Sequence, residues 1–298
     1  MKRRDSLYLK IAGFTIAVHL KRAKEDHNGN KLLRRIAYFF NNFLETKPKK
    51  IDSAIDIKET SFSTFLVKKS SDYILFLKRF KNKKILTFSH ISIAQFETIV
   101  LKVLERLLWK KGFVLHCSAV ACGDEAFIFL EKSGGGKSTL VRLLSKDFLP
   151  IADDNLIIKK EENSYFAYQM PTMKEKMKGI KKGKEIYLVK RIFFLRKAKF
   201  IKIEKIKNTH FIVKKIFRQF FTEREYLIKQ SKLLFDFITN LEFYYFYFNK
   251  NKKTAIYFRR FINNSLNHRT VEENNSYNLQ PSTAHNRSPK DHPLNHDN

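Results

Sequence analysis

The sequence predicts an α/β protein with a mixed sheet, in which a small β-rich module precedes a larger domain. Three observations lead to this fold class. Strand-like segments dominate residues 1–90, and a capped amphipathic helix begins after Ser92. Beyond that helix, apolar strands alternate with helices as far as residue 262. With 298 residues, the chain is long enough to bury a substantial core.

The N-terminal module is expected over residues 1–90. Residues 7–20 have the alternation of two short strands that turn near Gly13. Turns that contain Lys and Ser separate three further strand-like stretches, at residues 62–67, 73–77 and 85–88. Residues 21–60 are weakly patterned, so we assign no regular element there.

A well-marked helix follows this module. Ser92 and Gln95 have the spacing of a capping box, and Gly112 is placed to supply a left-handed C-terminal cap. Between them, apolar residues recur at helical spacing, namely Ile93, Phe96, Val100, Val103, Leu104 and Leu107. This stripe predicts a helix packed against the core rather than a ligand site.

The next segment is the most informative one. Two apolar strands, expected at residues 113–120 and 126–130, form a hairpin and lead into a glycine-rich loop, after which residues 138–146 read as a helix. Glycines let backbone N–H groups turn towards phosphate oxygens without Cβ clashes, and the positive end of the helix points at the same phosphates. The pattern is that of a P-loop, formed by Ser133, Gly134, Gly135, Gly136, Lys137, Ser138 and Thr139.

The P-loop predicts ATP and Mg²⁺ as cofactors. Lys137 can reach the β- and γ-phosphates, and the Ser138 hydroxyl can ligate Mg²⁺. The first position of the usual pattern, five residues before Gly136, holds Glu131 in place of glycine. That glycine serves mainly the turn out of the strand, so we expect an adjusted turn and no loss of a phosphate donor. The alternative interpretation is a glycine-rich loop ahead of an ordinary helix.

An acidic pair and a histidine complete the set of candidate catalytic residues. Asp153 and Asp154 end the strand expected at residues 149–152, and Asp153 comes only 16 residues after Lys137. One carboxylate can assist Mg²⁺ while the other accepts a proton from an attacking hydroxyl, and the residues alone leave open which does which. An Asp-rich turn is the structural alternative. His116 lies on the strand before the loop, where it is either structural or close to the site.

The remaining chain is predicted to return to strands and helices before a polar tail. Residues 186–195 read as a strand, residues 209–239 as largely helical after an N-cap at Asn208 or Thr209, and residues 243–248 with 254–258 as a last hairpin. The tail, residues 263–298, is rich in Asn, Ser, Pro and His and is expected to be disordered. Its four histidines have no fixed geometry and are not expected to bind a metal: His268, His285, His292 and His296.

From His116 to the acidic pair, the chain resembles the catalytic domain of HPr kinase/phosphorylase and its relatives, the HPr-kinase-like serine kinases. The resemblance covers roughly residues 90–260, and residues 113–158 carry nearly all of its specificity. It implies a fold like that of phosphoenolpyruvate carboxykinase. It also implies that Lys137 and Ser138 bind ATP·Mg²⁺ and that the acidic pair supplies a base and a metal-assisting group. By analogy Asp153 is the base, Asp154 joins Ser138 at the metal, and His116 matches the family's active-site histidine.

The resemblance implies a kinase that transfers the γ-phosphate to a serine or similar hydroxyl of a protein, a peptide or a small molecule. The glycine-rich signature that follows the acidic strand in HPr kinase/phosphorylases is not found here, and the N-terminal module is shorter than their regulatory domain. A P-loop ATPase and a nucleotide-binding sensor are the alternative functions. Family members often assemble, so a homo-oligomer is compatible with the resemblance.

The charge raises a third alternative, a protein that binds nucleic acid. The formal net charge is +30, from 59 Lys and Arg against 29 Asp and Glu. The basic residues are spread along the chain without one stripe at helical spacing, so we expect solvated faces instead. Four of them could steer a phosphate or an acidic substrate, although a solvated loop accounts for them better: Lys174, Lys176, Lys178 and Arg191.

Cysteine usage and hydropathy point to a reduced, cytoplasmic protein. Cys117 and Cys122 cannot form a disulfide framework and are expected to be small buried residues. No apolar run approaches the ~18 residues of a membrane span. The basic and apolar start of the chain alternates like a strand and has no cleavage site, so we do not interpret it as a signal peptide.

Overall fold

The computed structural model confirms an α/β protein with mixed sheets, as the sequence predicts. The chain divides into two compact units, and the division falls between Thr254 and Ala255. The described residues are 6–21, 28–58, 78–79, 84–88, 91–172, 180, 183, 185–221 and 224–264.

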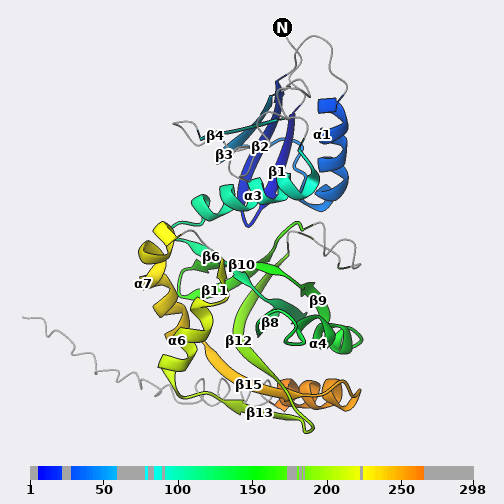
Figure 1. Cartoon of the computed structure of the whole chain (residues 1–298), viewed down its shortest axis with the longest axis vertical. Coiled ribbons are helices and arrows are strands. Elements are labelled where there is room, and N and C mark those ends of the chain that lie inside the picture. The colour runs from blue at the N-terminus through cyan, green and yellow to red at the C-terminus, as the bar shows by residue number, and fades with distance from the viewer. Residues whose placement is uncertain are drawn as a thin grey trace, which may run out of the picture. The chain divides into compact units, whose positions relative to one another are not determined.

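The N-terminal part of the first unit is a mixed five-stranded sheet with the order β1-β2-β3-β5-β4 (Figure 1). Strands β2, β3 and β5 run parallel, while β1 and β4 are antiparallel to their neighbours. The strand bounds are Ser6–Ile11 for β1, Phe14–Lys21 for β2, Ser53–Lys58 for β3, Lys78–Arg79 for β4 and Lys84–Phe88 for β5. The stretches expected at residues 62–67 and 73–77 lie outside the described residues.

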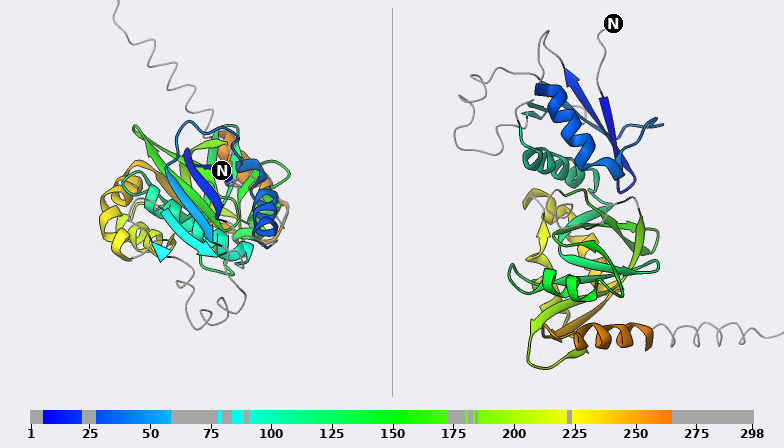
Figure 2. Two further views of the ribbon diagram at one scale, coloured as in Figure 1. Left: turned by 90° about the horizontal axis from the view of Figure 1, so that it is seen from above. Right: turned by 90° about the vertical axis from the view of Figure 1, so that its right-hand side faces the viewer.

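Two helices complete this part, and the sequence predicts only one of them. The helix α3, Ile93–Leu107, begins with the expected capping box, in which the Gln95 amide donates to the Ser92 hydroxyl at 3.2 Å. The helix α1, Asn28–Phe39, falls in the stretch where we assign no element. It buries Leu32, Leu33 and Ile36 at helical spacing and contacts both α3 and β2 (Figure 2). A short helical turn, Asn41–Phe43, follows it.

The expected C-terminal cap at Gly112 is wrong. The left-handed residue after α3 is Lys110, with φ 64°. Gly112 is instead the first residue of a strand, where a Cβ atom would approach the Ile158 carbonyl oxygen to 2.2 Å. Glycine is therefore needed there for close backbone approach rather than for a turn.

The larger sheet has ten strands and carries the glycine-rich loop. Its main path has the order β14-β6-β10-β11-β12-β8-β7-β9, and β15 joins β12 to β13. The strand bounds are Gly112–His116 for β6, Ser118–Cys122 for β7, Glu125–Leu130 for β8, Leu149–Ala152 for β9, Asn155–Glu161 for β10, Ser164–Gln169 for β11, Ile186–Lys197 for β12, Lys202–Lys205 for β13, Phe220–Phe221 for β14 and Glu242–Phe248 for β15.

The helices of this part are α4, Lys137–Leu144, α6, Thr209–Phe217, and α7, Arg224–Asn240. The single helical stretch expected over residues 209–239 is interrupted by β14, whose Phe220 and Phe221 pair with β6. Asn208 caps α6 as predicted, because its side chain accepts a hydrogen bond from the Phe211 amide.

The strand expected at residues 254–258 is wrong, because residues 253–264 form a helix. Ala255, Phe258 and Ile262 are buried whereas Ile256 and Tyr257 are exposed, which is the spacing of one helical face. The remainder of the predicted tail, with its four histidines, lies outside the described residues.

Two hydrophobic cores support the first unit. One joins the five-stranded sheet, α1 and α3 to Val114, Ile157 and Tyr168 of the larger sheet and to Met170, which follows β11. The other fills the opposite side of the larger sheet, against α6 and α7. Helix α3 and these residues belong to the same core as the five-stranded sheet. The module boundary expected near residue 90 stays a prediction.

The acidic residues lie in the turn between β9 and β10, beside a break between β6 and β7. The stretch expected as one strand at residues 113–120 is broken at Cys117, and β6 and β7 run antiparallel to β10 and β9 on either side of the break. The Cys117 amide donates to the Asp154 carbonyl at 3.0 Å. The break between β6 and β7 therefore lies opposite Asp153 and Asp154.

Candidate functional site

The glycine-rich loop lies between the end of β8 and the start of α4. Gly134 and Gly136 have left-handed backbones, with φ 75° and 99°, which glycine adopts without strain. The Gly135 amide donates to the Lys132 carbonyl at 3.0 Å and closes the turn. Gly136 is the N-cap of α4, so the first amides of this helix face the concave side of the loop. Strand, loop and helix thus occur in the order that an anion-binding loop requires.

Lys137 is buried in this loop. Its side chain is only 8% exposed, and its Nζ donates to the Glu131 carbonyl at 2.5 Å. Burial lowers the pKa of the Lys137 ammonium below its ordinary value of 10.5, and the nearby groups that oppose this shift are Cys117, Asp154, Glu131 and Asp153. A bound anion would favour the charged form of this lysine.

The acidic pair lies in the bend between β9 and β10. Asp153 is 6% exposed, and one of its carboxylate oxygens accepts a hydrogen bond from the Ser118 hydroxyl at 2.9 Å. Asp154 is more open, and its Oδ1 lies 3.5 Å from the Nδ1 atom of His116. The structure therefore brings His116 to the acidic pair and gives the two carboxylates different surroundings.

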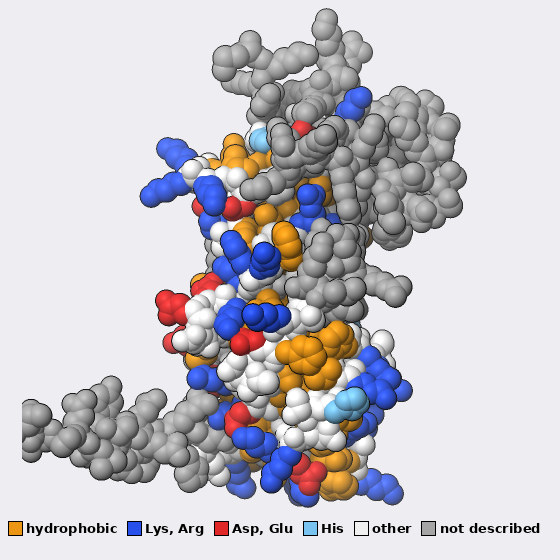
Figure 3. All heavy atoms as spheres, turned by 90° about the vertical axis from the view of Figure 1, so that its left-hand side faces the viewer, with side chains coloured by type: hydrophobic (Ala, Val, Ile, Leu, Met, Phe, Trp, Pro, Cys, Tyr) orange, Lys and Arg blue, Asp and Glu red, His pale blue; other side chains and the backbone are white. Residues whose placement is uncertain are grey.

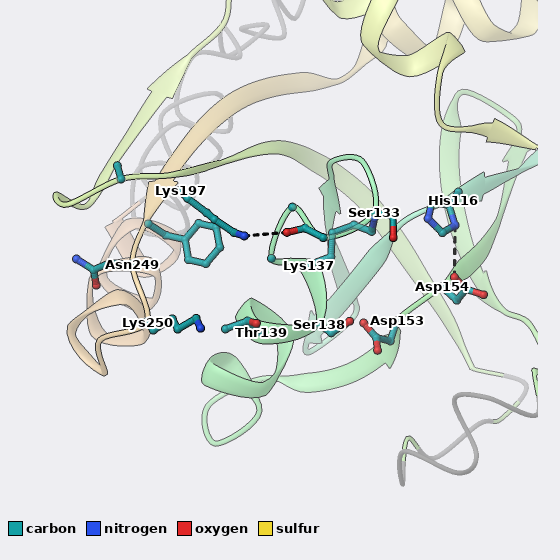
Figure 4. Close-up of a pocket in the computed structure, with 15 residues that line it drawn as sticks. His116, Ser133, Lys137, Ser138, Thr139, Asp153, Asp154, Lys197, Asn249 and Lys250 are labelled. Atoms are coloured by element: carbon teal, nitrogen blue, oxygen red, sulfur yellow. Dashed lines mark hydrogen bonds and ion pairs between the residues drawn. The ribbon is translucent and has the colours of Figure 1, made fainter.

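One cavity of about 460 Å³ joins these groups (Figure 4). It is lined by all seven residues of the predicted P-loop and by His116, Asp153 and Asp154. The residues predicted to bind the cofactors and to take part in catalysis thus all line the same cavity.

The sequence alone does not predict the opposite wall of the cavity. It comes from the ends of β12 and β15 and consists of Lys197, Ala198, Phe248, Asn249 and Lys250. Lys197 donates to the Gly134 carbonyl at 2.8 Å, and the Phe248 ring is so close to Gly136 that a Cβ atom there would lie 2.7 Å from it. In Figure 4, Lys250 lies near Thr139, at the end away from His116 and Asp154. The cavity therefore has an acidic end and a basic end.

Parallel pairing explains why these residues meet the loop. Strand β12 pairs in parallel with both β8 and β15, with Phe194 opposite Leu130 and Lys197 opposite Phe248. The carboxyl ends of all three strands consequently reach the same edge of the sheet. A strand ending in a basic residue is a weak signal in sequence, so only the pairing identifies this wall.

Three other residues noted in the sequence do not line the cavity, namely Arg191, Cys117 and Cys122. Arg191 is buried in β12 and pairs with Glu242 at 3.3 Å, so it does not line the cavity and cannot steer a substrate there. Cys117 is buried as expected. Cys122 is exposed, because it is the last residue of β7 at the hairpin turn. The remaining candidates for steering a substrate, Lys174, Lys176 and Lys178, lie outside the described residues.

The basic charge is dispersed on the face drawn in Figure 3. Lys and Arg side chains are scattered there among acidic, hydrophobic and other side chains. The described part of this face therefore has no continuous basic stripe of the kind that nucleic-acid binding favours. Within the described ranges, no helix has the length and apolar character needed to cross a bilayer.

Comparison with known proteins gives a family and a weak structural likeness. The family model described as SynChlorMet cassette protein ScmC matches residues 65–241. The structure of the Hpr(Ser) kinase/phosphatase from Coxiella burnetii is 12% identical and aligns with a TM-score of 0.35, covering 56% of this chain and 99% of that one. This likeness is too weak to support an argument. No curated protein sequence matches this one.

Proposed function

The chain belongs to the family of the SynChlorMet cassette protein ScmC, and we propose that it is an ATP- and Mg²⁺-dependent kinase acting on a serine or similar hydroxyl. The acceptor is a protein, a peptide or a small molecule. We also propose a catalytic fold like that of phosphoenolpyruvate carboxykinase. The family description names no reaction, so the proposal rests on the site.

One observation carries the proposal: the P-loop and the acidic pair line the same cavity. The glycine backbones and the start of α4 offer amides to phosphate oxygens, and Lys137 adds a buried positive charge. Asp153, Asp154 and His116 face the same space. A phosphate cradle beside carboxylates that can accept a proton is the combination that transfer to a hydroxyl requires.

The residues present fit Mg²⁺ and a nucleoside triphosphate. The described residues contain no cluster of three His, Cys, Asp or Glu side chains that could hold a metal by themselves. Mg²⁺ needs no such cluster, because it usually takes one or two protein oxygens and completes its shell with phosphate and water. The Ser138 hydroxyl and a carboxylate of the acidic pair supply oxygens of this kind. When bound, the ion would neutralise charge on the transferred phosphoryl group.

The chain's own groups have separable roles in this proposal. Lys137 and the loop amides bind and orient the phosphates, so the reaction gains from positioning and from charge stabilisation. One carboxylate takes the proton of the acceptor hydroxyl and the other assists Mg²⁺. Ser118 holds Asp153 through one oxygen, while His116, 3.5 Å away, orients Asp154. Lys197 and Lys250 add positive charge at the other end of the cavity.

Transfer of label from γ-labelled ATP with Mg²⁺ tests the proposal. Candidate acceptors are free serine, the HPr protein and short peptides encoded beside this chain. We expect wild type to label an acceptor, Lys137→Ala to abolish labelling, and Asp153→Asn or Asp154→Asn to reduce the rate by about 10²–10⁴-fold. Lys146→Ala, an exposed lysine just beyond α4, is the matched control and should retain wild-type activity.

A titration of Mg²⁺ separates the two carboxylates. Loss of the metal-assisting carboxylate should raise the Mg²⁺ concentration needed for half-maximal rate, whereas loss of the base should lower the rate at every Mg²⁺ concentration. Release of labelled phosphate with no acceptor labelled would identify an ATPase instead. Failure of the wild-type protein to bind ATP would refute the proposal.

A further inference from the structure

Glu131 occupies the position where P-loops usually have glycine, and both its backbone and its side chain contact residues of the loop. Its carbonyl accepts the hydrogen bond from Lys137 described above. Its side chain is 12% exposed and lies against Gly135, where a Cβ atom would be 2.3 Å from the Glu131 Cγ atom. The side chain does not line the cavity, so it acts from behind the loop.

The two oxygens of the Glu131 carboxylate have different partners. Oε1 accepts a hydrogen bond from the Lys132 amide at 3.0 Å. Oε2 is buried and has no hydrogen-bond partner, but it lies 3.7 Å from the Nζ atom of Lys215, which is 20% exposed. The carboxylate charge is therefore balanced across a short gap by a lysine of α6.

The segment that carries Lys215 also contacts the acidic end of the site. Immediately after α6, the Gln219 carbonyl accepts a hydrogen bond from the His116 amide at 2.8 Å. The next two residues form β14, which pairs with β6, the strand that bears His116. One short segment thus contacts both Glu131 and the strand that bears His116.

A carboxylate behind an anion-binding loop repels the phosphates of a triphosphate and so weakens its binding. This electrostatic repulsion is stronger in a poorly solvated site than in water. A lysine 3.7 Å away removes most of that effect. We propose that Glu131 and Lys215 form a positioning pair, in which Lys215 neutralises Glu131 so that the loop can accept the phosphates of the nucleotide. This inference rests on the proposed function, because it assumes that the loop binds a nucleoside triphosphate.

A double-mutant cycle on the full chain tests the pair, with the dissociation constant for ATP·Mg²⁺ measured by calorimetry. Lys215→Met should weaken binding by about tenfold, because it leaves the carboxylate uncompensated. Glu131→Gln should bind ATP as tightly as wild type or more tightly. The combined variant should regain the affinity of Glu131→Gln to within about threefold, which a purely structural role of Lys215 would not produce.

Two further variants guard against misfolding and general charge effects. Lys215→Arg keeps the charge and should retain wild-type affinity. Lys214→Met removes the neighbouring exposed lysine of α6 and should change the affinity by less than about twofold. The weakening in Lys215→Met should also diminish at high salt.

The outcomes distinguish the pair from the proposed function. Wild-type protein that binds ATP, together with a Lys215→Met variant that binds equally well, would overturn the pair alone. A combined variant as weak as Lys215→Met would do the same. Wild-type protein that binds no ATP would overturn both the proposed function and this role of the pair.

Discussion

At the scale of single residues, Lys137 combines burial with a charged function. Burial lowers the pKa of its ammonium, while the opposing groups around it, Cys117, Asp154, Glu131 and Asp153, limit the shift. A nucleotide adds several negative charges beside the same ammonium and so raises its pKa again. The Lys137 ammonium therefore holds its proton more strongly in the nucleotide complex than in the free protein.

This difference predicts that nucleotide affinity depends on pH. Between the lowered pKa of Lys137 in the free protein and its higher pKa in the complex, binding takes up a proton, so affinity should fall as pH rises through the free-state value. The limiting slope is about tenfold per pH unit. Calorimetry in two buffers of different ionisation enthalpy would measure the proton uptake. Lys137→Arg, which stays charged, should show neither effect, and a wild-type affinity independent of alkaline pH would contradict the expectation.

At the scale of elements, the P-loop depends on the strand β15 as well as on its own sequence. Gly134 and Gly136 both have left-handed backbones, but they differ in their surroundings. A Cβ atom at Gly134 would meet nothing within 4 Å, whereas one at Gly136 would lie 2.7 Å from the tip of the buried Phe248 ring. The conformation of the loop at Gly136 therefore also depends on packing against Phe248 of β15.

The two glycines form a matched pair for a prediction about stability. Gly134→Ala should lower the free energy of unfolding by about 1–2 kcal/mol, the cost of a left-handed backbone with a Cβ atom. Gly136→Ala should cost about 3 kcal/mol or more, because it also displaces Phe248. Denaturant unfolding would measure both. Adding Phe248→Leu to Gly136→Ala should recover the packing part of the loss, and equal losses for the two single variants would refute this account.

At the scale of the whole molecule, the strand β10 separates two cores. Ile157 belongs to the core shared with the five-stranded sheet, and its neighbour Ile158 belongs to the core beneath α6 and α7. Both side chains are fully buried. Because one strand serves both cores, we expect the first unit to unfold cooperatively.

Truncation of either isoleucine tests this cooperativity. Ile157→Ala and Ile158→Ala should each lower the free energy of unfolding by about 2–5 kcal/mol and shift one common transition. Ile186→Ala, at a position 48% exposed, should cost less than about 1 kcal/mol. Two separate transitions in calorimetry, with Ile157→Ala moving only one of them, would show that the two sheets unfold independently.

Local patterns in the chain account for much of the predicted structure. The strand β8, the loop and α4 follow one another without interruption, so periodicity and glycine content locate them. The capping box of α3 and the N-cap at Asn208 are likewise local features. The sequence does not predict the helix α1, because its buried residues, Leu32, Leu33 and Ile36, are mixed with charged residues in a stretch without other signals.

The α/β class, the glycine-rich loop and the candidate residues on both sides of it can be predicted from the sequence, because each depends on residues close together in the chain. Three contacts are visible only once the chain is folded: His116 faces Asp154, Lys197 and Phe248 form the opposite wall of the cavity, and Lys215 lies 3.7 Å from Glu131. These contacts join segments far apart in the chain, and strand pairing and helix packing bring them together. Pairing depends on the energy of the whole sheet, which no short segment encodes.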